Sequence, residues 1–268
     1  MSLLPPASPT GAVLVTGASS GIGEQIAREF ARRGYPVLLV ARRADKLTEL
    51  AAALGAQAHV LAADLADPEQ RAALPERVAA LGLTVDVLVN NAGLSNLGAV
   101  ARVEPADELR LIEVDVAAVV DLSTRLVPGM VARGRGAVLN VASVGGFGPV
   151  PFQASYGAAK AFVLSYTEAM REELRGSGVT ASVVCPGPVR TGFGAAAGIP
   201  DDEAEKMLPR FLWEQADTVA RVAIDGLAGG RPVIVPGAPN RAAALLYRYA
   251  PHRLLLPLLG RSHPGRSA

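Results

Sequence analysis

Short apolar segments alternate along the chain with alanine-rich segments in which apolar residues recur at helical spacing. The apolar segments are residues 12–15, 37–40, 59–63, 85–89, 137–142, 180–184 and 232–235. Continuous apolar strands are typical of a sheet covered on both faces, and their alternation with helices favours parallel strands. The pattern predicts an α/β fold: a doubly wound, Rossmann-like, mostly parallel sheet of seven strands with helices on both faces.

Glycines mark the ends of three predicted helices. Gly34, Gly134 and Gly176 each follow a helical segment that is rich in arginine near its end. Glycine readily adopts the left-handed C-cap conformation, and positive charge suits the negative end of the helix dipole. No repeat or linker interrupts residues 10–238, which we expect to be one domain. Residues 1–9 are expected to be a disordered tail, and residues 239–268 a basic, apolar extension whose last eight residues are disordered.

The composition excludes several classes of function. The chain has 268 residues, 50% of them hydrophobic, which is enough for a large core. Its 26 Lys and Arg balance 25 Asp and Glu, so no nucleic-acid partner is expected. The single cysteine, Cys185, permits no intrachain disulfide, and we expect no metal site. With no secretory pattern and no apolar run of about 20 residues, a cytoplasmic protein is expected.

The first apolar segment leads directly into the sequence TGASSGIG, residues 16–23, and then into a helix predicted to begin near Glu24. A glycine-rich turn in this position lets backbone N–H groups approach a pyrophosphate at the positive end of the helix. A tight turn also needs glycines for its own conformation, so this motif alone allows both interpretations. Its spacing is G-x-x-x-G-x-G instead of the usual G-x-G-x-x-G.

Further motifs follow in order: Asp64-Leu65, NNAG at residues 90–93, Ser143, YGAAK at residues 156–160 and PGPVRT at residues 186–191. Together with TGASSGIG, they resemble the short-chain dehydrogenase/reductase family over about residues 10–238. The resemblance implies a nicotinamide-dependent oxidoreductase. It also implies a dimer or tetramer built on the long helices around residues 106–128 and 155–175.

Tyr156 and Lys160 are the candidate catalytic pair. Four residues apart on a helix, they lie on one face about 6 Å apart along the axis. A free tyrosine has a pKa of about 10, and a fixed ammonium nearby favours the phenolate. The spacing alone would also suit an ordinary surface pair. The resemblance implies that Tyr156 is the general acid/base, that Lys160 also holds the nicotinamide ribose, and that Ser143, at a strand end, orients the substrate oxygen.

The chain departs from the family pattern at Asp115. The resemblance implies an asparagine here, which helps to hold a water between the lysine and solvent. An ionised aspartate accepts hydrogen bonds but cannot donate them, and it favours the charged form of Lys160. Asp115 is therefore a candidate catalytic residue, with a solvated helix position as the alternative.

The end of the second strand indicates which cofactor is bound. Ala41 stands where NAD binding usually calls for an acid, and Arg42 and Arg43 follow. This favours NADP(H), with Arg42 as the expected contact to the 2'-phosphate, although both arginines could simply begin a surface helix. The resemblance also implies that Asp64 accepts from the adenine amino group, that Asn90 and Gly93 line the adenosine, and that Val189 and Thr191 meet the carboxamide. The full set of expected cofactor contacts is Gly17, Ser19, Ser20, Gly21, Ile22, Gly23, Arg42, Asp64, Leu65, Asn90, Gly93, Tyr156, Lys160, Pro186, Gly187, Val189 and Thr191.

Large apolar residues follow Ser143 and Thr191 and could form a lid over the nicotinamide. They are Phe147, Phe152, Phe193, Met207, Phe211 and Trp213. Such a lid favours a small, apolar carbonyl or alcohol substrate, such as a hydrophobic ketone or aldehyde, over a sugar. The same residues would equally suit a core or a contact between subunits.

The chain after Asp225 contains no acid and six arginines: Arg231, Arg241, Arg248, Arg253, Arg261 and Arg266. Within it, residues 241–261 are too short and too charged to span a bilayer, but they would suit an interfacial helix on anionic lipid, or packing on another subunit. Pro251 and Pro257 predict short helical pieces.

An NADP(H)-dependent oxidoreductase is the favoured function. A non-catalytic NADP(H)-sensing or scaffold protein, and a protein acting mainly at a membrane surface, are the alternatives.

Overall fold

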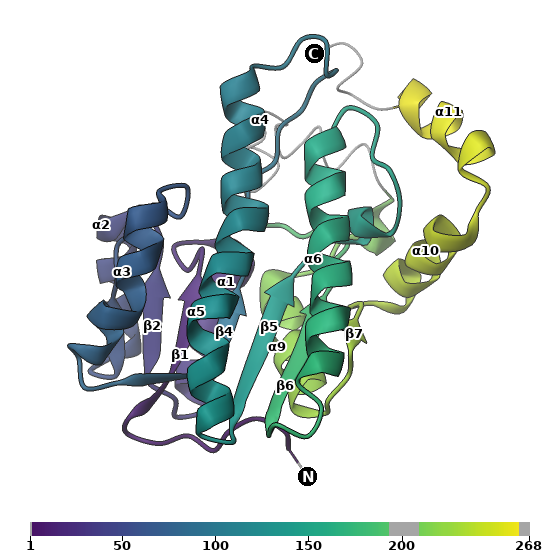
Figure 1. Cartoon of the computed structure of the whole chain (residues 1–268). Coiled ribbons are helices and arrows are strands. Elements are labelled where there is room, and N and C mark those ends of the chain that lie inside the picture. Colours follow the sequence, from purple (N-terminus) through teal and green to yellow (C-terminus); the bar gives the residue numbers. More distant parts are fainter. Residues whose placement is uncertain (1, 193–208, 263–268) are drawn as a thin grey trace.

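Seven parallel strands form one sheet at the centre of the molecule, in the order β3-β2-β1-β4-β5-β6-β7 (Figure 1). The structure is a computed structural model that describes residues 2–192 and 209–262. Each pair of neighbouring strands is parallel. The doubly wound, seven-stranded α/β fold expected from the sequence is therefore confirmed.

The strands match the predicted apolar segments closely. They are β1 Gly11–Thr16, β2 Val37–Val40, β3 Ala58–Val60, β4 Thr84–Asn90, β5 Gly136–Val141, β6 Val179–Val184 and β7 Val233–Ile234. The α-helices are α1 Gly21–Arg32, α2 Ala44–Leu54, α3 Pro68–Ala79, α4 Pro105–Ile112, α5 Ala118–Ala132, α6 Ala154–Glu173, α9 Ala216–Ala228, α10 Ala238–Tyr249 and α11 His252–Ser262. A π-helix, η1 Glu113–Ala117, and the 3-10 helices η2 Val144–Phe147 and η3 Arg210–Leu212 complete the described elements.

Helices cover both faces of the sheet, and the side chains of each strand alternate between the two layers. On β1, Val13 and Val15 pack into the core that includes Phe30 of α1 and residues of α2 and α9. Ala12 and Leu14 point to the opposite face, where α3, α5 and α6 pack. This two-sided burial explains why the strands are continuously apolar.

The boundaries of β3 and α1 differ most from the sequence expectation. The strand β3 ends at Val60 instead of Ala63, although the Leu61 and Ala63 N–H groups still bond to carbonyls on the neighbouring chain segment at 2.9 and 3.0 Å. Helix α1 begins at Gly21 instead of near Glu24, because Ser20 is its extended N-cap. The three predicted C-terminal glycines do adopt positive φ, at 83°, 64° and 82°.

Residues 2–9 contact the domain, in contrast to the disordered tail expected from their composition. The Leu3 N–H donates to the Ala228 carbonyl at 2.8 Å, and the Tyr35 hydroxyl donates to the Pro5 carbonyl at 2.7 Å. Pro5 is itself buried. The segment thus lies against the domain through backbone hydrogen bonds that its amino-acid composition does not reveal.

The C-terminal extension forms two helices. Ala250 leaves the helical conformation, with φ −67° and ψ 144°, and so separates α10 from α11. Extended backbone is what a following proline, here Pro251, imposes. Pro257 lies within α11 and does not end it. The residues from 263 onward, part of the predicted C-terminal tail, lie outside the described residues.

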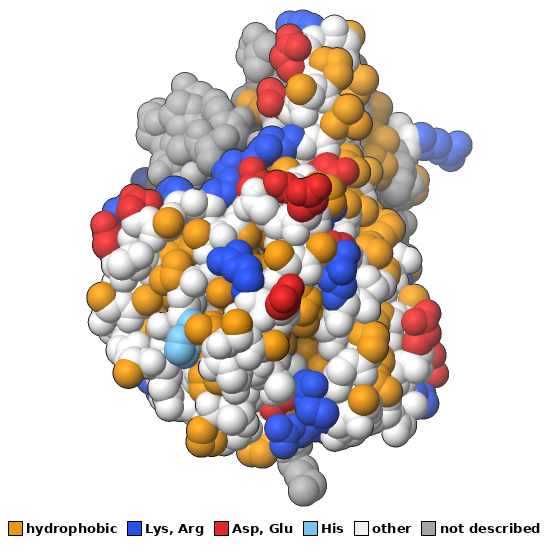
Figure 2. Space-filling model, turned by 60° about the vertical axis from the view of Figure 1, so that its left-hand side comes forward, with side chains coloured by type: hydrophobic (Ala, Val, Ile, Leu, Met, Phe, Trp, Pro, Cys, Tyr) orange, Lys and Arg blue, Asp and Glu red, His pale blue; other side chains and the backbone are white. Residues whose placement is uncertain are grey.

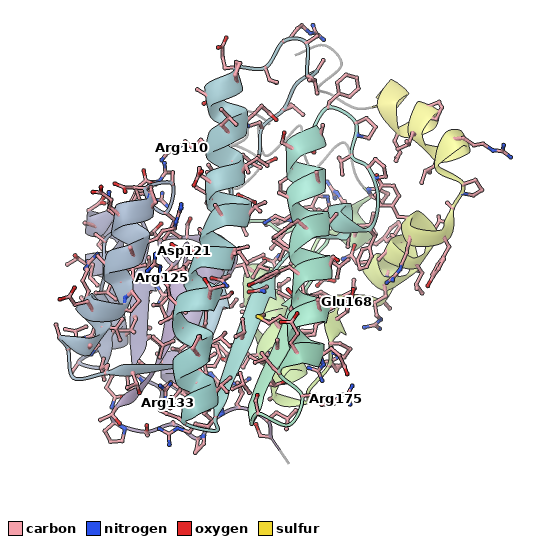
Figure 3. All side chains as sticks on the ribbon, viewed as in Figure 1. Arg110, Asp121, Arg125, Arg133, Glu168 and Arg175 are labelled. Carbon is pink, nitrogen blue, oxygen red and sulfur yellow. The ribbon has the colours of Figure 1, made fainter. Side chains whose placement is uncertain are left out.

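Helix α4, the π-helix η1 and helix α5 follow one another without a break and form one long rod. A π turn widens the helix by one residue and often occurs at functional sites. On this rod, Arg125 pairs with Asp121 at 2.6 Å, as the labels in Figure 3 locate them. Arg71 of α3 reaches Asp121 at 3.3 Å and Glu113 of η1 at 3.0 Å.

Figure 2 shows Lys and Arg side chains interspersed with Asp and Glu on the side of the molecule that it presents.

We expect Phe30→Ala to lower the free energy of unfolding by about 3–5 kcal/mol, because it empties a fully buried site. Phe30 also packs edge-to-face on Tyr35, with ring centroids 5.4 Å apart. Urea unfolding monitored by circular dichroism measures the change. Leu81→Ala, at a half-exposed surface position, is the control and should stay within about 0.5 kcal/mol of the wild type. Equal stability of the two variants would contradict this assignment of the core.

Candidate active site

The glycine-rich turn between β1 and α1 needs its glycines for its own conformation and packing. Gly17 and Gly21 have φ of 66° and 61°, in the left-handed region that favours glycine. A Cβ on Gly23 would lie 2.5 Å from the Gly17 carbonyl oxygen, which leaves no room for a side chain. Ile22, between them, packs against the core. The turn leads directly into the N-terminus of α1, the kind of position where a pyrophosphate would bind.

The NNAG segment at the end of β4 locks this turn in place. Asn91 donates from Nδ2 to the Thr16 carbonyl at 2.8 Å, and its N–H donates to Thr16 Oγ1 at 2.9 Å. Asn90, expected to line the adenosine, has a buried side chain that bonds to Asn140 at 2.9 Å and Ser123 at 3.3 Å. Its amide therefore braces the sheet, while the side chain of the next residue, Asn91, contacts the turn.

Arg43 is the arginine that contacts the glycine-rich turn. Its guanidinium donates to Ser19 Oγ at 2.9 Å and to Ser20 Oγ at 2.8 Å. Arg42, the residue chosen from the sequence, is exposed beside it. Both arginines stand at the end of β2, where the sequence lacks an acid. Two adjacent cations at this position could not be told apart by pattern alone.

Asp64, after β3, lies in an electropositive environment. Arg110 of α4, labelled in Figure 3, donates to its Oδ2 at 2.6 Å, and the Ala66 N–H donates to its Oδ1 at 3.0 Å. Partial burial acts to raise the pKa of this carboxyl, but the Ala66 N–H and the Arg110 guanidinium outweigh it, so the pKa lies below its usual value. Leu65 is buried, and its carbonyl accepts from Arg71 at 2.6 Å.

The candidate catalytic side chains converge on α6 and on the end of β5. Lys160 Nζ lies 5.6 Å from the centroid of the Tyr156 ring. A Cβ built on Gly145 would lie 3.5 Å from Ser143 Oγ and 3.8 Å from Tyr156 Cε1, so the serine and the tyrosine flank the same glycine. Ser143 Oγ accepts from the Gly145 N–H at 3.1 Å, which leaves its hydroxyl hydrogen to be donated.

Asp115 and Lys160 form a buried ion pair. The Lys160 Nζ to Asp115 Oδ2 distance is 2.9 Å, and the two side chains are 5% and 0% exposed. The Leu94 N–H donates to the other carboxylate oxygen at 2.7 Å, while Nζ also donates to the Val141 carbonyl at 3.3 Å. The alternative of a solvated helix position for Asp115 is therefore wrong. The aspartate contacts the lysine directly.

Burial raises the pKa of the Asp115 carboxyl, against the opposing effects of Lys160 and the Leu94 N–H. The pair nevertheless favours the charged form of Lys160. Desolvation of the buried ammonium acts to lower the pKa of Lys160, but the Asp115 carboxylate and the Tyr156 side chain raise it above its ordinary value. Gly93 closes one side of the pair. A Cβ at this position would lie 3.0 Å from Asp115 Oδ2 and 3.1 Å from Lys160 Nζ. The last glycine of NNAG thus makes space for the pair.

The segment after β6 crosses from the catalytic side chains to the glycine-rich turn. The Pro186 carbonyl accepts from the Val144 N–H at 2.9 Å, next to Ser143. A Cβ on Gly21 would lie 3.0 Å from Cβ of Thr191, whose hydroxyl donates to the Val189 carbonyl at 3.3 Å. Thr191, expected near the nicotinamide carboxamide, therefore lies against the turn.

Residues of the C-terminal extension contact the segments after β6 and after Ser143. The sequence motifs did not indicate these contacts. A Cβ on Gly187 would collide with Asn240 of α10, at 2.3 Å from its Oδ1. Asn240 is buried and donates to the Leu212 carbonyl at 3.0 Å. The Tyr247 hydroxyl donates to the carbonyl of Pro149, in the segment after Ser143. No local signal could have found these contacts, because they join segments far apart in the chain.

A polar cluster, also missed by sequence reasoning, fixes the start of α6. The Ser155 hydroxyl donates to Glu108 of α4, which also accepts from Asn96 at 3.2 Å. Gln153 donates to Ser95 at 2.7 Å. These bonds tie the segment after β4 to the residues just before Tyr156.

The residues expected to form a lid do not share one environment. Trp213 has the Arg190 guanidinium 5.7 Å from its ring centroid. Phe147 packs against a buried cluster, and Phe211 is exposed. Phe152 has a φ of 63°, which is unusual for a non-glycine residue and marks strain in the segment before Tyr156. Phe193 and Met207 lie outside the described residues. Cys185 is a buried free thiol, and burial raises its pKa to about 12.

Comparison with known proteins gives consistent relatives. The short chain dehydrogenase family matches residues 11–200. The chain is 35% identical over 215 residues to sulfoacetaldehyde reductase 2 of Chromohalobacter salexigens, covering 78% of this chain and 85% of that protein. It is 37% identical over 180 residues to ketoacyl reductase HetN of a Nostoc species, covering 66% of this chain and 63% of that protein.

Among solved structures of similar fold, one contains NADPH and another contains NAD. A short-chain dehydrogenase from Sphingobium yanoikuyae in complex with NADPH is 35% identical, with a TM-score of 0.79 over 88% of this chain and 91% of that chain. A short chain dehydrogenase/reductase from Burkholderia phymatum in complex with NAD is 25% identical, also with a TM-score of 0.79, over 93% of this chain and 95% of that chain.

We expect Asp115→Asn to lower the free energy of unfolding at pH 7 by about 3–5 kcal/mol, because it leaves a buried ammonium without its counter-charge. The amide keeps an acceptor for the Leu94 N–H, so the change isolates the charge. Because the pKa of Lys160 is raised in the folded state, the charged lysine contributes fully to the free energy of unfolding below the unfolded-state pKa of about 10.4. This contribution is lost as the pH rises through the folded-state pKa.

Urea unfolding of the wild type and of this variant from pH 7 to above pH 10 tests this. The difference should be largest near pH 7 and should shrink as the pH rises through the folded-state pKa of Lys160, because a neutral lysine no longer needs the counter-charge. Glu49→Gln, which removes the exposed partner of Lys46, is the control and should change little. A folded Asp115→Asn protein as stable as the wild type at pH 7 would refute the role of the pair.

Proposed function

The chain belongs to the short-chain dehydrogenase family, and we propose that it is an NADP(H)-dependent oxidoreductase acting on a small, apolar carbonyl or alcohol. The observation that carries this proposal is the convergence of Ser143, Tyr156 and charged Lys160 beside the glycine-rich turn. Ser143 follows the end of β5, whereas Tyr156 and Lys160 lie in the first two turns of α6, yet the three side chains face one region. That arrangement serves proton transfer next to a bound dinucleotide.

Each of the three side chains has a separate task. A nicotinamide dinucleotide bound along this edge of the sheet would supply or accept the hydride at the substrate carbon. Ser143 donates its hydroxyl hydrogen to the substrate oxygen and stabilises the charge that develops there. In the reduction direction, Tyr156 gives its proton to that oxygen, which completes the alcohol, and in oxidation it takes the proton back. Lys160 favours the phenolate that remains.

Asp115 is a positioning residue in this scheme. Its carboxylate holds the ammonium at 2.9 Å, while the Val141 carbonyl holds it from β5 at 3.3 Å. Lys160 therefore has a fixed position and a fixed charge next to Tyr156. The direct contact takes the place of the water-linked arrangement that an asparagine supports in the family pattern.

The preference for NADP(H) rests on positive charge at the end of β2. A 2'-phosphate there would meet two arginines, and no acid stands at the position that usually binds the 2'-hydroxyl. Arg43 already reaches the serines of the turn, so it is the stronger candidate, with Arg42 as a second cation. Asp64, which is paired with Arg110, is proposed to accept from the adenine amino group.

The remaining proposals concern partners and location. Leu109, Ile112, Val131 and Phe162 are exposed on α4, α5 and α6, which supports a dimer or tetramer built on these helices. We propose a cytoplasmic protein with a small-molecule substrate and no nucleic-acid partner. A non-catalytic NADP(H) sensor on the same fold is the second candidate, and the departure from the family pattern at Asp115 is the observation that favours it.

We expect Tyr156→Phe to abolish turnover while NADPH binding persists, because the ring stays and only the proton-carrying hydroxyl is lost. NADPH oxidation is followed against a panel of apolar ketones and aldehydes, with NADPH affinity measured in parallel. General acid–base catalysis contributes about 100-fold to 10,000-fold, so a loss of at least this size is predicted. Tyr166→Phe, two to three turns further along α6, is the control. Tight binding with no turnover by the wild type on any carbonyl would favour the sensor.

We expect Arg43→Ala to weaken NADPH binding about 10-fold to 100-fold, because a hydrogen bond between charged groups is lost. Affinity for NADH should change little, since it carries no 2'-phosphate. Arg42→Ala, tested beside it, ranks the two arginines by their separate effects. If both variants bind NADPH as tightly as the wild type, the proposed basis for NADP(H) preference is wrong.

A further inference from the structure

Helix α10 has two faces of different character. On its inner face, Asn240 and Ala244 are buried, and Tyr247 donates to the Pro149 carbonyl. On its outer face, Leu245, Leu246 and Tyr249 are 60%, 66% and 74% exposed. Figure 1 shows α10 and α11 at the right-hand edge of the molecule, outside α6 and β7. The helix is thus anchored to the domain on one side and presents apolar side chains on the other.

The exposed residues form one continuous stripe. Ala242, Leu245, Leu246 and Tyr249 recur at intervals of three and four residues, which places them on a single side of a helix. The inner residues Asn240, Ala244 and Tyr247 fall on the opposite side. We call Ala242, Leu245, Leu246 and Tyr249 the outer stripe.

Positive charge borders the outer stripe. Arg241 and Arg248 are exposed on α10, on the same flank of the stripe, and Arg248 lies over the Tyr249 ring at 5.9 Å. Arg253 is exposed at the start of α11. Residues 226–268 contain no Asp or Glu that could neutralise these arginines from within the extension. An apolar stripe flanked only by cations is the composition of helices that lie in an anionic membrane interface.

We propose that the outer stripe docks on the surface of an anionic lipid bilayer. Leu245, Leu246 and Tyr249 enter the boundary between headgroups and acyl chains, while Arg241 and Arg248 bind the lipid phosphates. The contact is peripheral, because no helix among the described residues has both the length and the hydropathy to cross a membrane. It does not depend on the proposed reaction.

Charge favours a bilayer over a second copy of the chain as the occupant of this face. A two-fold interface places the same surface patch of both subunits in contact. Here it would bring Arg241 and Arg248 of one copy against their equivalents, with no acid in the extension to pair them. Anionic lipid supplies the missing counter-charge and also accepts the apolar side chains.

Vesicle flotation with the full chain tests the proposal. Vesicles of phosphatidylcholine alone are compared with vesicles that also contain phosphatidylglycerol, at low and at raised NaCl. The full chain should bind only the anionic vesicles, and less so as salt rises. Leu245→Ser with Leu246→Ser should weaken binding about tenfold or more, because it removes the buried apolar area. Arg241→Gln with Arg248→Gln should weaken binding and reduce its salt dependence.

Matched controls keep the outcome interpretable. Leu81→Ser removes an exposed leucine elsewhere, and Arg32→Gln with Arg175→Gln removes the same charge from α1 and from the end of α6. Both should bind like the wild type. Thermal melting of every variant checks folding, and light scattering gives its mass. No binding of the full chain to anionic vesicles, or equal binding by the leucine variant, overturns the proposal. A lower mass for the leucine variant would instead assign the face to a second copy.

Discussion

A lysine ammonium without bulk water must be stabilised by the protein, and in this chain the Asp115 carboxylate does so at 2.9 Å. The pair joins four parts of the fold. Lys160 comes from α6, Asp115 from the π-helix, the Val141 carbonyl from β5, and the Leu94 N–H from the segment after β4. Gly93 leaves the space that the pair occupies. The position and charge of the group beside Tyr156 therefore depend on one buried interaction.

The parallel sheet determines where this interaction lies. All seven strands end at the same edge, and strand order places β4 between β1 and β5. The glycine-rich turn, the NNAG segment and Ser143 consequently meet at the carboxyl ends of adjacent strands, where open α/β sheets bind ligands. The π turn then brings Asp115 to Lys160. The strand order therefore determines where the site lies, and the π turn places the negative charge of Asp115 next to Lys160.

The sequence pattern predicted those features of the fold that are set by residues close together in the chain, such as strands and helix ends. The run at 37–40 became β2 without change, and Gly34 adopted the positive φ expected of a C-cap. Burial of Asp115 could not be predicted, because it results from the packing of α4, η1 and α6 together. The contact between Gly187 and Asn240 joins the domain to its extension, and the choice between Arg42 and Arg43 depends on side-chain direction. These are long-range or conformational properties that a linear pattern does not contain.

The central claim, that Tyr156 and its charged partner serve hydride transfer to a carbonyl, is tested most directly by isotope transfer. The wild type is incubated with NADPH deuterated at the reactive carbon of the nicotinamide and with apolar ketones and aldehydes, and the products are analysed by mass spectrometry. The account predicts an alcohol that carries deuterium on the former carbonyl carbon. A protein that binds NADPH tightly yet yields no labelled alcohol from any carbonyl would contradict it.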